Sequence, residues 1–149
     1  MNKFLENFEI RKIFQKTVYL LQELGINLGY HFGWYLNGPY STSLADDGYE
    51  MAGLRISSKN IRELRTELPT KDIHDRISIL FKDLDLENVE SAQSLELLAS
   101  LHFILKHAYP KTKSSEEAKQ KLKKSKPNRF DDQEIDMAMD ALRKAGLAE

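Results

Sequence analysis

Apolar residues recur at helical spacing near the beginning of the chain, with charged and amide side chains between them. Such spacing places the apolar residues on one stripe of an amphipathic helix. Glycine is a common residue directly after a helix, so Gly25 marks its expected end. The positions on this stripe of the predicted helix are Ile10, Ile13, Phe14, Thr17, Val18, Leu21 and Leu24.

The pattern changes to strict alternation over residues 30–36, which predicts a β-strand. Phe32, Trp34 and Leu36 would share the face toward the core. The following pair Gly38-Pro39 is expected to end the strand, because proline cannot donate to a ladder and glycine permits a positive φ.

A helix is expected after this turn, capped by Ser41 or Ser43 and running to Gly53. Residues 54–56 predict a second short strand that would pair with the first. A two-stranded unit of this kind needs support from helices to be stable.

Helical patterns fill the remainder of the chain. A short helix is expected over residues 57–68, Thr70 is expected to cap the next helix, and residues 90–107 are apolar around much of their circumference, as in a central buried helix. A short polar helix is predicted over 115–124. The last helix has the clearest start, a capping box between Asp131 and Glu134 flanked by a hydrophobic staple of Phe130 and Ile135.

These patterns predict a mainly α protein, α+β by count, with about six to seven helices and a small two-stranded β-element. The 149 residues fit one compact domain, since no linker separates two cores. A helix, a capped second helix and a short β-element are also the minimal parts of a winged-helix arrangement.

The amino-acid composition limits the classes of protein and of functional site that are expected. The chain is 41% apolar and 30% charged, as expected of a globular protein, and its net charge of −1 gives no global attraction to nucleic acid or membrane. The absence of cysteine excludes disulfides and thiolate sites. The N-terminus lacks an apolar signal run, and no stretch approaches the ~18 apolar residues of a spanning helix, so a cytoplasmic protein that does not enter the membrane is expected.

No catalytic or metal-binding constellation emerges from the residue pattern. His102 and His107 share a predicted helix, but five positions place them roughly 140° apart around it. Ser41 and Ser43 lack a nucleophile elbow and are better explained as helix caps. We therefore expect no metal, no cofactor and no enzymatic activity, with an enzyme of unidentified type the least favoured alternative.

Two surfaces remain as candidates for binding. A turn carries the candidate partner-binding residues, since loops accumulate functional residues and tyrosine suits interfaces: Tyr35, Asn37, Tyr40, Ser41 and Ser43. A basic run is the candidate nucleic-acid surface, although lysines late in a helix are also favoured by its dipole: Lys119, Lys121, Lys123, Lys124, Lys126 and Arg129.

The sequence RKIFQKTVYLL at residues 11–21, followed by FGWYLNGPYS at 32–41, resembles the start of Panacea-like antitoxin domains and their uncharacterised bacterial and archaeal relatives. LELLASLHF at 95–103 and KPNRF at 126–130 are similar to the uncharacterised branch. The resemblance implies a mostly helical domain with a small β-element over residues 1–149. In the better-known branch it implies antitoxins that bind a toxin directly, or adaptors that deliver it to a protease.

Two functional hypotheses follow. The first is a non-enzymatic protein-interaction or regulatory domain, antitoxin-like or adaptor-like, whose protein partner is a toxin or a protease-delivered substrate. The second is a winged-helix-like, DNA-binding transcription regulator, with Ser41, Thr42, Ser43 and the basic run on phosphates. The near-neutral net charge makes nucleic acid the less favoured partner. The sequence leaves the oligomeric state and the partner's identity open.

Overall fold

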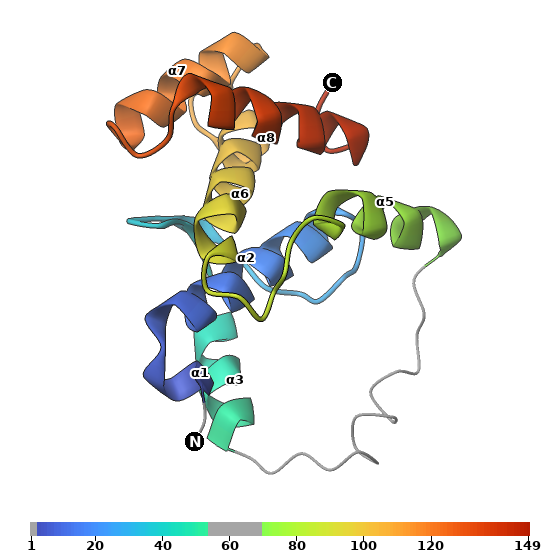
Figure 1. The fold of residues 1–149 in the computed structure, drawn as a ribbon, viewed down its shortest axis with the longest axis vertical. Coiled ribbons are helices and arrows are strands. Elements are labelled where there is room, and N and C mark those ends of the chain that lie inside the picture. Colours follow the sequence, from blue (N-terminus) through green and yellow to red (C-terminus); the bar gives the residue numbers. More distant parts are fainter. Residues whose placement is uncertain (1–2, 54–69) are drawn as a thin grey trace.

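Helix α6 (Ser91–His107) lies at the centre of the computed structural model (Figure 1). It contacts α2 (Phe8–Glu23), α7 (Ser115–Ser125), α8 (Asp132–Lys144) and strand β2 (Gly38–Tyr40). The structure describes residues 3–53 and 70–149. The expected strand at 54–56 and helix at 57–68 lie outside these residues. The protein is mainly α with one small β-element, as predicted.

Helix α6 is buried on most of its sides, which confirms the prediction of a central helix over 90–107. Leu95, Ala99 and Leu101 are fully buried. Two polar residues of the same helix, Glu96 and His102, are equally inaccessible to solvent. An apolar circumference predicts such burial, but it does not predict the two ionisable groups.

Helix α2 follows the four-residue helix α1 (Lys3–Glu6) and starts at Asn7, whose side chain accepts hydrogen bonds from the backbone N–H groups of the first turn. Ile13 and Val18 of its expected stripe are buried, and so is Leu20, which the spacing does not place on that stripe. The helix ends before Gly25, which takes the left-handed conformation with φ 119°. The predicted helix is therefore confirmed.

Strands β1 (Gly33–Tyr35) and β2 form an antiparallel hairpin in which Trp34 lies opposite Pro39. The first strand ends before Gly38-Pro39, as expected, but this pair itself belongs to the return strand. Gly38 has φ 96° and begins the return strand, and both strands of a two-stranded sheet are edge strands, where proline is tolerated.

The expected burial of the strand is also corrected. Phe32 packs on the core, but Trp34 is 39% exposed and Leu36 is 90% exposed. Leu36 lies in the turn between the strands, so the alternation of a strand no longer determines where its side chain points.

The other predicted helices begin at residues whose side-chain oxygens accept a backbone N–H, as helix caps do. They are α3 (Thr42–Gly53), α5 (Lys71–Phe81), α7 and α8. Helix α8 has the predicted capping box, with hydrogen bonds in both directions between Asp131 and Glu134. The capping residues are Ser41 for α3, Thr70 for α5, Ser114 for α7 and Asp131 for α8.

Helices α7 and α8 pack on α6 at one end of the molecule, and α1 and α3 lie at the other (Figure 1). Phe130 and Ile135, the predicted staple residues, are both part of the core. No helix among the described residues is both long and apolar enough to cross a membrane. We call the fully buried leucines and isoleucine of the three helices the C-terminal core: Leu95, Leu101, Leu122, Ile135 and Leu142.

Candidate functional site

A pocket of about 350 Å³ opens between α1, α2, the hairpin and α3. Two edge-to-face ring pairs shape its wall, with centroids 5.6 Å apart for Phe4 and Tyr49 and 5.2 Å apart for Tyr35 and Tyr40. Such arrangements are the preferred geometry of aromatic pairs. The pocket is therefore aromatic on several sides. We call its aromatic lining residues the aromatic rim: Phe4, Phe8, Tyr35, Tyr40 and Tyr49.

The structure brings three of the five predicted partner-binding residues to this pocket. Tyr35, Asn37 and Tyr40 line it, and the Tyr35 side chain is 50% exposed. Leu36, a core residue by the strand pattern, lines the pocket too. The hairpin turn thus presents a mixed aromatic and aliphatic surface.

The two serines have other roles. Ser41, one of the candidate partner-binding residues, is buried and not exposed at the surface. Its Oγ accepts a hydrogen bond from the Leu44 backbone, and its own backbone exchanges two hydrogen bonds with the Gln15 amide, at 2.9 and 3.0 Å. Ser43 is exposed, lies outside the pocket lining and shares a hydrogen bond of 3.2 Å with Ser41. Ser41 anchors the hairpin to α2, which explains its burial.

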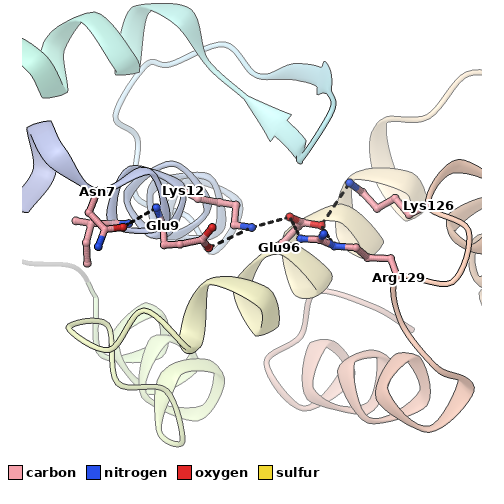
Figure 2. A network of polar contacts seen from close by, with 7 residues as sticks. Asn7, Glu9, Lys12, Glu96, Lys126 and Arg129 are labelled. Carbon is pink, nitrogen blue, oxygen red and sulfur yellow. Dashed lines mark hydrogen bonds and ion pairs between the residues drawn. The ribbon is translucent and has the colours of Figure 1, made fainter.

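Beneath the hairpin lies a set of buried polar side chains centred on Glu96 of α6, which has no exposed surface. Figure 2 shows Lys12 approaching its carboxylate from α2 and Lys126 and Arg129 approaching from the opposite side. Lys12 Nζ is 3.0 Å and Lys126 Nζ 3.4 Å from the carboxylate, while Arg129 donates two hydrogen bonds of 3.0 and 3.1 Å. The carboxylate is thus satisfied on both oxygens. We call this set the polar floor: Lys12, Gln15, Lys16, Glu96 and Ser100.

Glu96 remains ionised despite its burial. Removal from water alone would raise its pKa, but the hydrogen bond from Lys12 and the charges of Lys126 and Arg129 outweigh this effect. The pKa of Glu96 is consequently held below its usual range. A buried charge is tolerated when its partners are complete, which is the case here.

Lys16 is as buried as Glu96, but its ammonium group donates to the backbone carbonyl of Pro39 and forms no ion pair among the described residues. Burial lowers the pKa of Lys16 to about 7, against the opposing attraction of Glu96. Ser100 Oγ lies close by, beneath Gly38, and has no hydrogen-bond partner in the described part of the chain. This side of the floor holds polar groups that the protein itself leaves incompletely satisfied.

The predicted basic run is engaged with acidic groups. Lys119, Lys121 and Lys123 pair with Asp136, Glu117 and Asp132, in that order, at 2.7–3.3 Å. Lys126 and Arg129 belong to the Glu96 cluster. Within residues 3–53 and 70–149, Lys124 alone of the six makes no ion pair.

Lys126 connects this cluster to the hairpin. Its Nζ donates a hydrogen bond of 2.8 Å to the carbonyl of Leu36 and lies 5.5 Å from the centre of the Trp34 ring. A cation at that distance from an indole face is favourably placed. The turn that lines the pocket is therefore fixed from the C-terminal side of the chain.

Of the two histidines on α6, His102 lies in the interior and His107 at its edge. His102 Nδ1 is 2.8 Å from the Tyr19 hydroxyl, and burial lowers the pKa of His102 to about 4. His107 pairs with Glu23 at 2.7 Å. Across the described ranges, no three histidine, aspartate or glutamate side chains gather in a way that would hold a metal ion.

The sequence patterns do not reveal the polar floor. An amphipathic helix pattern places Lys12 and Lys16 among its solvent-facing spacers, and it gives Glu96 no role. A signal is nevertheless present, since Glu96 is the one acid inside the apolar run LELLASL at 95–101. A lone charge in a buried helix needs a partner, which points to an internal ion pair.

Comparison with family models, with curated proteins and with solved structures found no match for this chain. The resemblance to Panacea-like antitoxin domains therefore stays a prediction from the quoted sequence segments.

Proposed function

We propose that this chain is a non-enzymatic protein-interaction domain, antitoxin-like or adaptor-like, whose partner docks on the aromatic pocket. The observation that carries the proposal is the gathering of Tyr35, Asn37 and Tyr40 with rings from α1, α2 and α3 around one cavity. Residues from four separate elements converge there. Tyrosines placed around a pocket are typical of the residues that dominate binding energy in protein interfaces.

Exposure of apolar groups supports the same site. Leu36, Phe8, Tyr35 and Tyr49 are among the most exposed large apolar side chains in the described residues, and all four line the pocket. Scattered exposed apolar residues are normal in proteins, whereas a contiguous group marks an interaction surface. A partner that covers them would gain their burial as binding energy.

The frame of the pocket supports a binding role as well. The hairpin is held by Gln15 at one end and by Lys126 at the turn. A surface that is already ordered loses little conformational entropy when a partner binds. This arrangement suits recognition of a folded or extended protein segment.

The DNA-binding alternative receives less support. Most lysines of the basic run are paired with carboxylates, so contact with phosphates would first require these pairs to open. Glu96 adds a negative charge at the centre of the cluster that holds Lys126 and Arg129.

The test is partner recovery with variants of the exposed rim. Tagged full-length protein and its Tyr35→Ala and Leu36→Ser variants are produced in the native cells, and co-purifying proteins are quantified by mass spectrometry. We expect one protein to be enriched by the unchanged chain and to be reduced at least about tenfold by each variant, the typical loss of an interface hot spot. Met137→Ser is the matched control, because Met137 is 66% exposed on α8 and does not line the pocket.

The antitoxin role has its own readout. If the enriched partner is a toxin, co-expression of the unchanged chain is expected to restore growth, and the Tyr35→Ala variant is expected to restore it poorly. Equal recovery of partner by all the variants would contradict docking at this pocket.

A further inference from the structure

We infer that the pocket accepts an acidic segment of the protein partner, in which an aspartate or glutamate carboxylate faces the polar floor and a neighbouring aromatic or large aliphatic side chain packs within the aromatic rim. This inference rests on the proposed function and names the chemistry of the partner. Three observations support it: the positive charges that line the pocket, the pocket's size and apolar walls, and the buried polar groups of the floor that the described part of the chain leaves incompletely satisfied.

The charges of the pocket are of one sign. Arg11, Lys12 and Lys16 line it, and no aspartate or glutamate is among its described lining residues. The two acids that contact Lys12 are already paired, Glu96 with three cations and Glu9 with Lys12 at 3.4 Å. A ligand carboxylate would therefore meet attraction without a competing acid in the lining.

Positive charge also exceeds negative charge in the polar floor and the cations paired with it. Lys12, Lys126 and Arg129 all converge on the single carboxylate of Glu96, and Lys16 adds a further amine. Attraction between charges increases as water is removed, because the effective dielectric constant falls. A carboxylate placed over this floor would reduce the excess and gain more than it would at an open surface.

The rest of the pocket is lined by apolar groups and favours an apolar side chain of the partner. Phe4, Phe8 and Tyr49 form one wall, with Phe4 and Tyr49 in edge-to-face contact. The volume of about 350 Å³ lies at the small end of the range for ligand pockets, so it suits one large side chain and its neighbour. Asn37 at the turn adds an amide that can pair with the backbone of an extended segment.

Lys16 links binding to pH. The groups that act on its amine are Glu96 from α6, Lys12 from α2 and Lys126 from the end of α7. With a pKa of about 7, the amine is only partly protonated at neutral pH. A bound carboxylate favours the protonated form, so binding takes up a proton and affinity decreases as pH rises above about 7.

Peptide selection tests the inference even while the partner is unidentified. The full-length chain is used to select from a phage-displayed library of random dodecapeptides, and the Tyr35→Ala variant is used for counter-selection. We expect enriched peptides to carry an aspartate or glutamate within two positions of an aromatic residue, leucine or methionine. Enrichment of basic peptides, or of peptides without an acid, would overturn the inference.

The most enriched peptide is then measured by fluorescence anisotropy against its amide analogue, in which glutamine or asparagine replaces the acid. We expect the analogue to bind at least about tenfold more weakly, as for loss of a hydrogen bond to a charged group. Affinity for the acidic peptide should fall between about pH 6 and pH 8, and this dependence should be lost in Lys16→Met. Equal affinity of acid and amide overturns the inference even if Lys16→Met does not fold, because that comparison uses the unchanged protein.

A small aromatic acid is the competing occupant. Phenylacetate is titrated against the bound peptide, and displacement at or below the concentration that the peptide itself requires would overturn the assignment to a protein segment.

The experiments distinguish failure of this inference from failure of the proposed function. If Tyr35→Ala abolishes partner recovery but acid and amide peptides bind equally, the docking site stands and its acidic specificity is wrong. If acidic peptides bind but partner recovery ignores the rim variants, the proposed function is wrong.

Discussion

The C-terminal core and the polar floor are both buried, share helix α6 and are built from opposite kinds of side chain. Leu101 and Leu142 represent the first, and Lys16 and Glu96 the second. Apolar burial stabilises in proportion to the area removed from water and tolerates small shifts. A buried charge stabilises only while each partner stays in place, because an unpaired charge is costly.

This difference explains where the pocket lies. The floor supports the hairpin through the contact from Lys16 to Pro39, and Lys126, which pairs with Glu96 of the floor, adds a contact to Leu36. Three-residue strands have too little surface to stand alone. The core therefore stabilises the fold through apolar burial, whereas the floor depends on paired polar contacts that also position one short hairpin.

The largest effect is expected from Glu96→Gln, which keeps the shape of the side chain and removes its charge. Lys12, Lys126 and Arg129 would lose their common counter-charge, and breaking such a buried pair costs about 3–5 kcal/mol. Urea unfolding followed by circular dichroism measures the loss. Glu50→Gln, at an exposed position on α3, is the control and should change stability little. A loss below that of a surface substitution would show that the cluster contributes nothing to stability.

A second prediction concerns His102, which is buried in its neutral form on the same helix that holds Glu96 in its charged form. The pKa of His102 is about 4 in the folded protein and higher in the unfolded chain, so the unfolded state binds more protons between these values. Stability from this group is complete above about pH 6.5 and is lost as pH falls toward 4, on the order of 3 kcal/mol in total. The free energy of unfolding is measured across this pH range for the unchanged chain and for His102→Gln. Its dependence on pH should be steeper in the unchanged chain. Parallel pH profiles would contradict a buried neutral histidine.

The third prediction concerns the contact between hairpin and floor. A Cβ added at Gly38 would lie 2.3 Å from Ser100 Oγ, and the residue has φ 96°, so Gly38→Ala combines a clash with backbone strain. A loss of about 1–3 kcal/mol is expected. Gly53→Ala is the matched control, because the added Cβ meets no atom within 4 Å among the described residues. Hydrogen exchange at Tyr40 should rise in the first variant and stay unchanged in the second.

Local signals account for what could be predicted from the sequence. Asp131 with Glu134, and Thr70 before Ile73, identify helix starts because capping acts within one turn. The sequence predicts the end of the first strand before Pro39, but not the place of Pro39 inside β2, because tolerance of proline depends on the edge position of its strand. The sequence pattern places the partner strand at residues 54–56, whereas β2 itself pairs with β1.

The polar floor could not be predicted from such local signals. Lys12 and Glu96 are 84 positions apart, and Glu96 and Arg129 are 33 apart, so only the packing of α2 and the α7–α8 loop on α6 brings them together. Three pocket residues could be predicted from the composition of the turn. Phe4, Phe8 and Tyr49 could not, because nothing local shows that α1 and α3 meet the hairpin.

The smallest effect is expected at the start of α8, on the edge of the C-terminal core. Asp131→Ala removes the side chain that accepts the Glu134 N–H at 2.7 Å, and loss of such a cap costs about 1 kcal/mol. The stripe of Ile135, Met139 and Leu142 remains buried, so the helix is expected to persist. Thermal unfolding should show a modest decrease that Asp131→Asn largely avoids, since asparagine also caps helices. A loss as large as that of Glu96→Gln would mean that the core, too, depends on single polar contacts, and the contrast with the floor would fail.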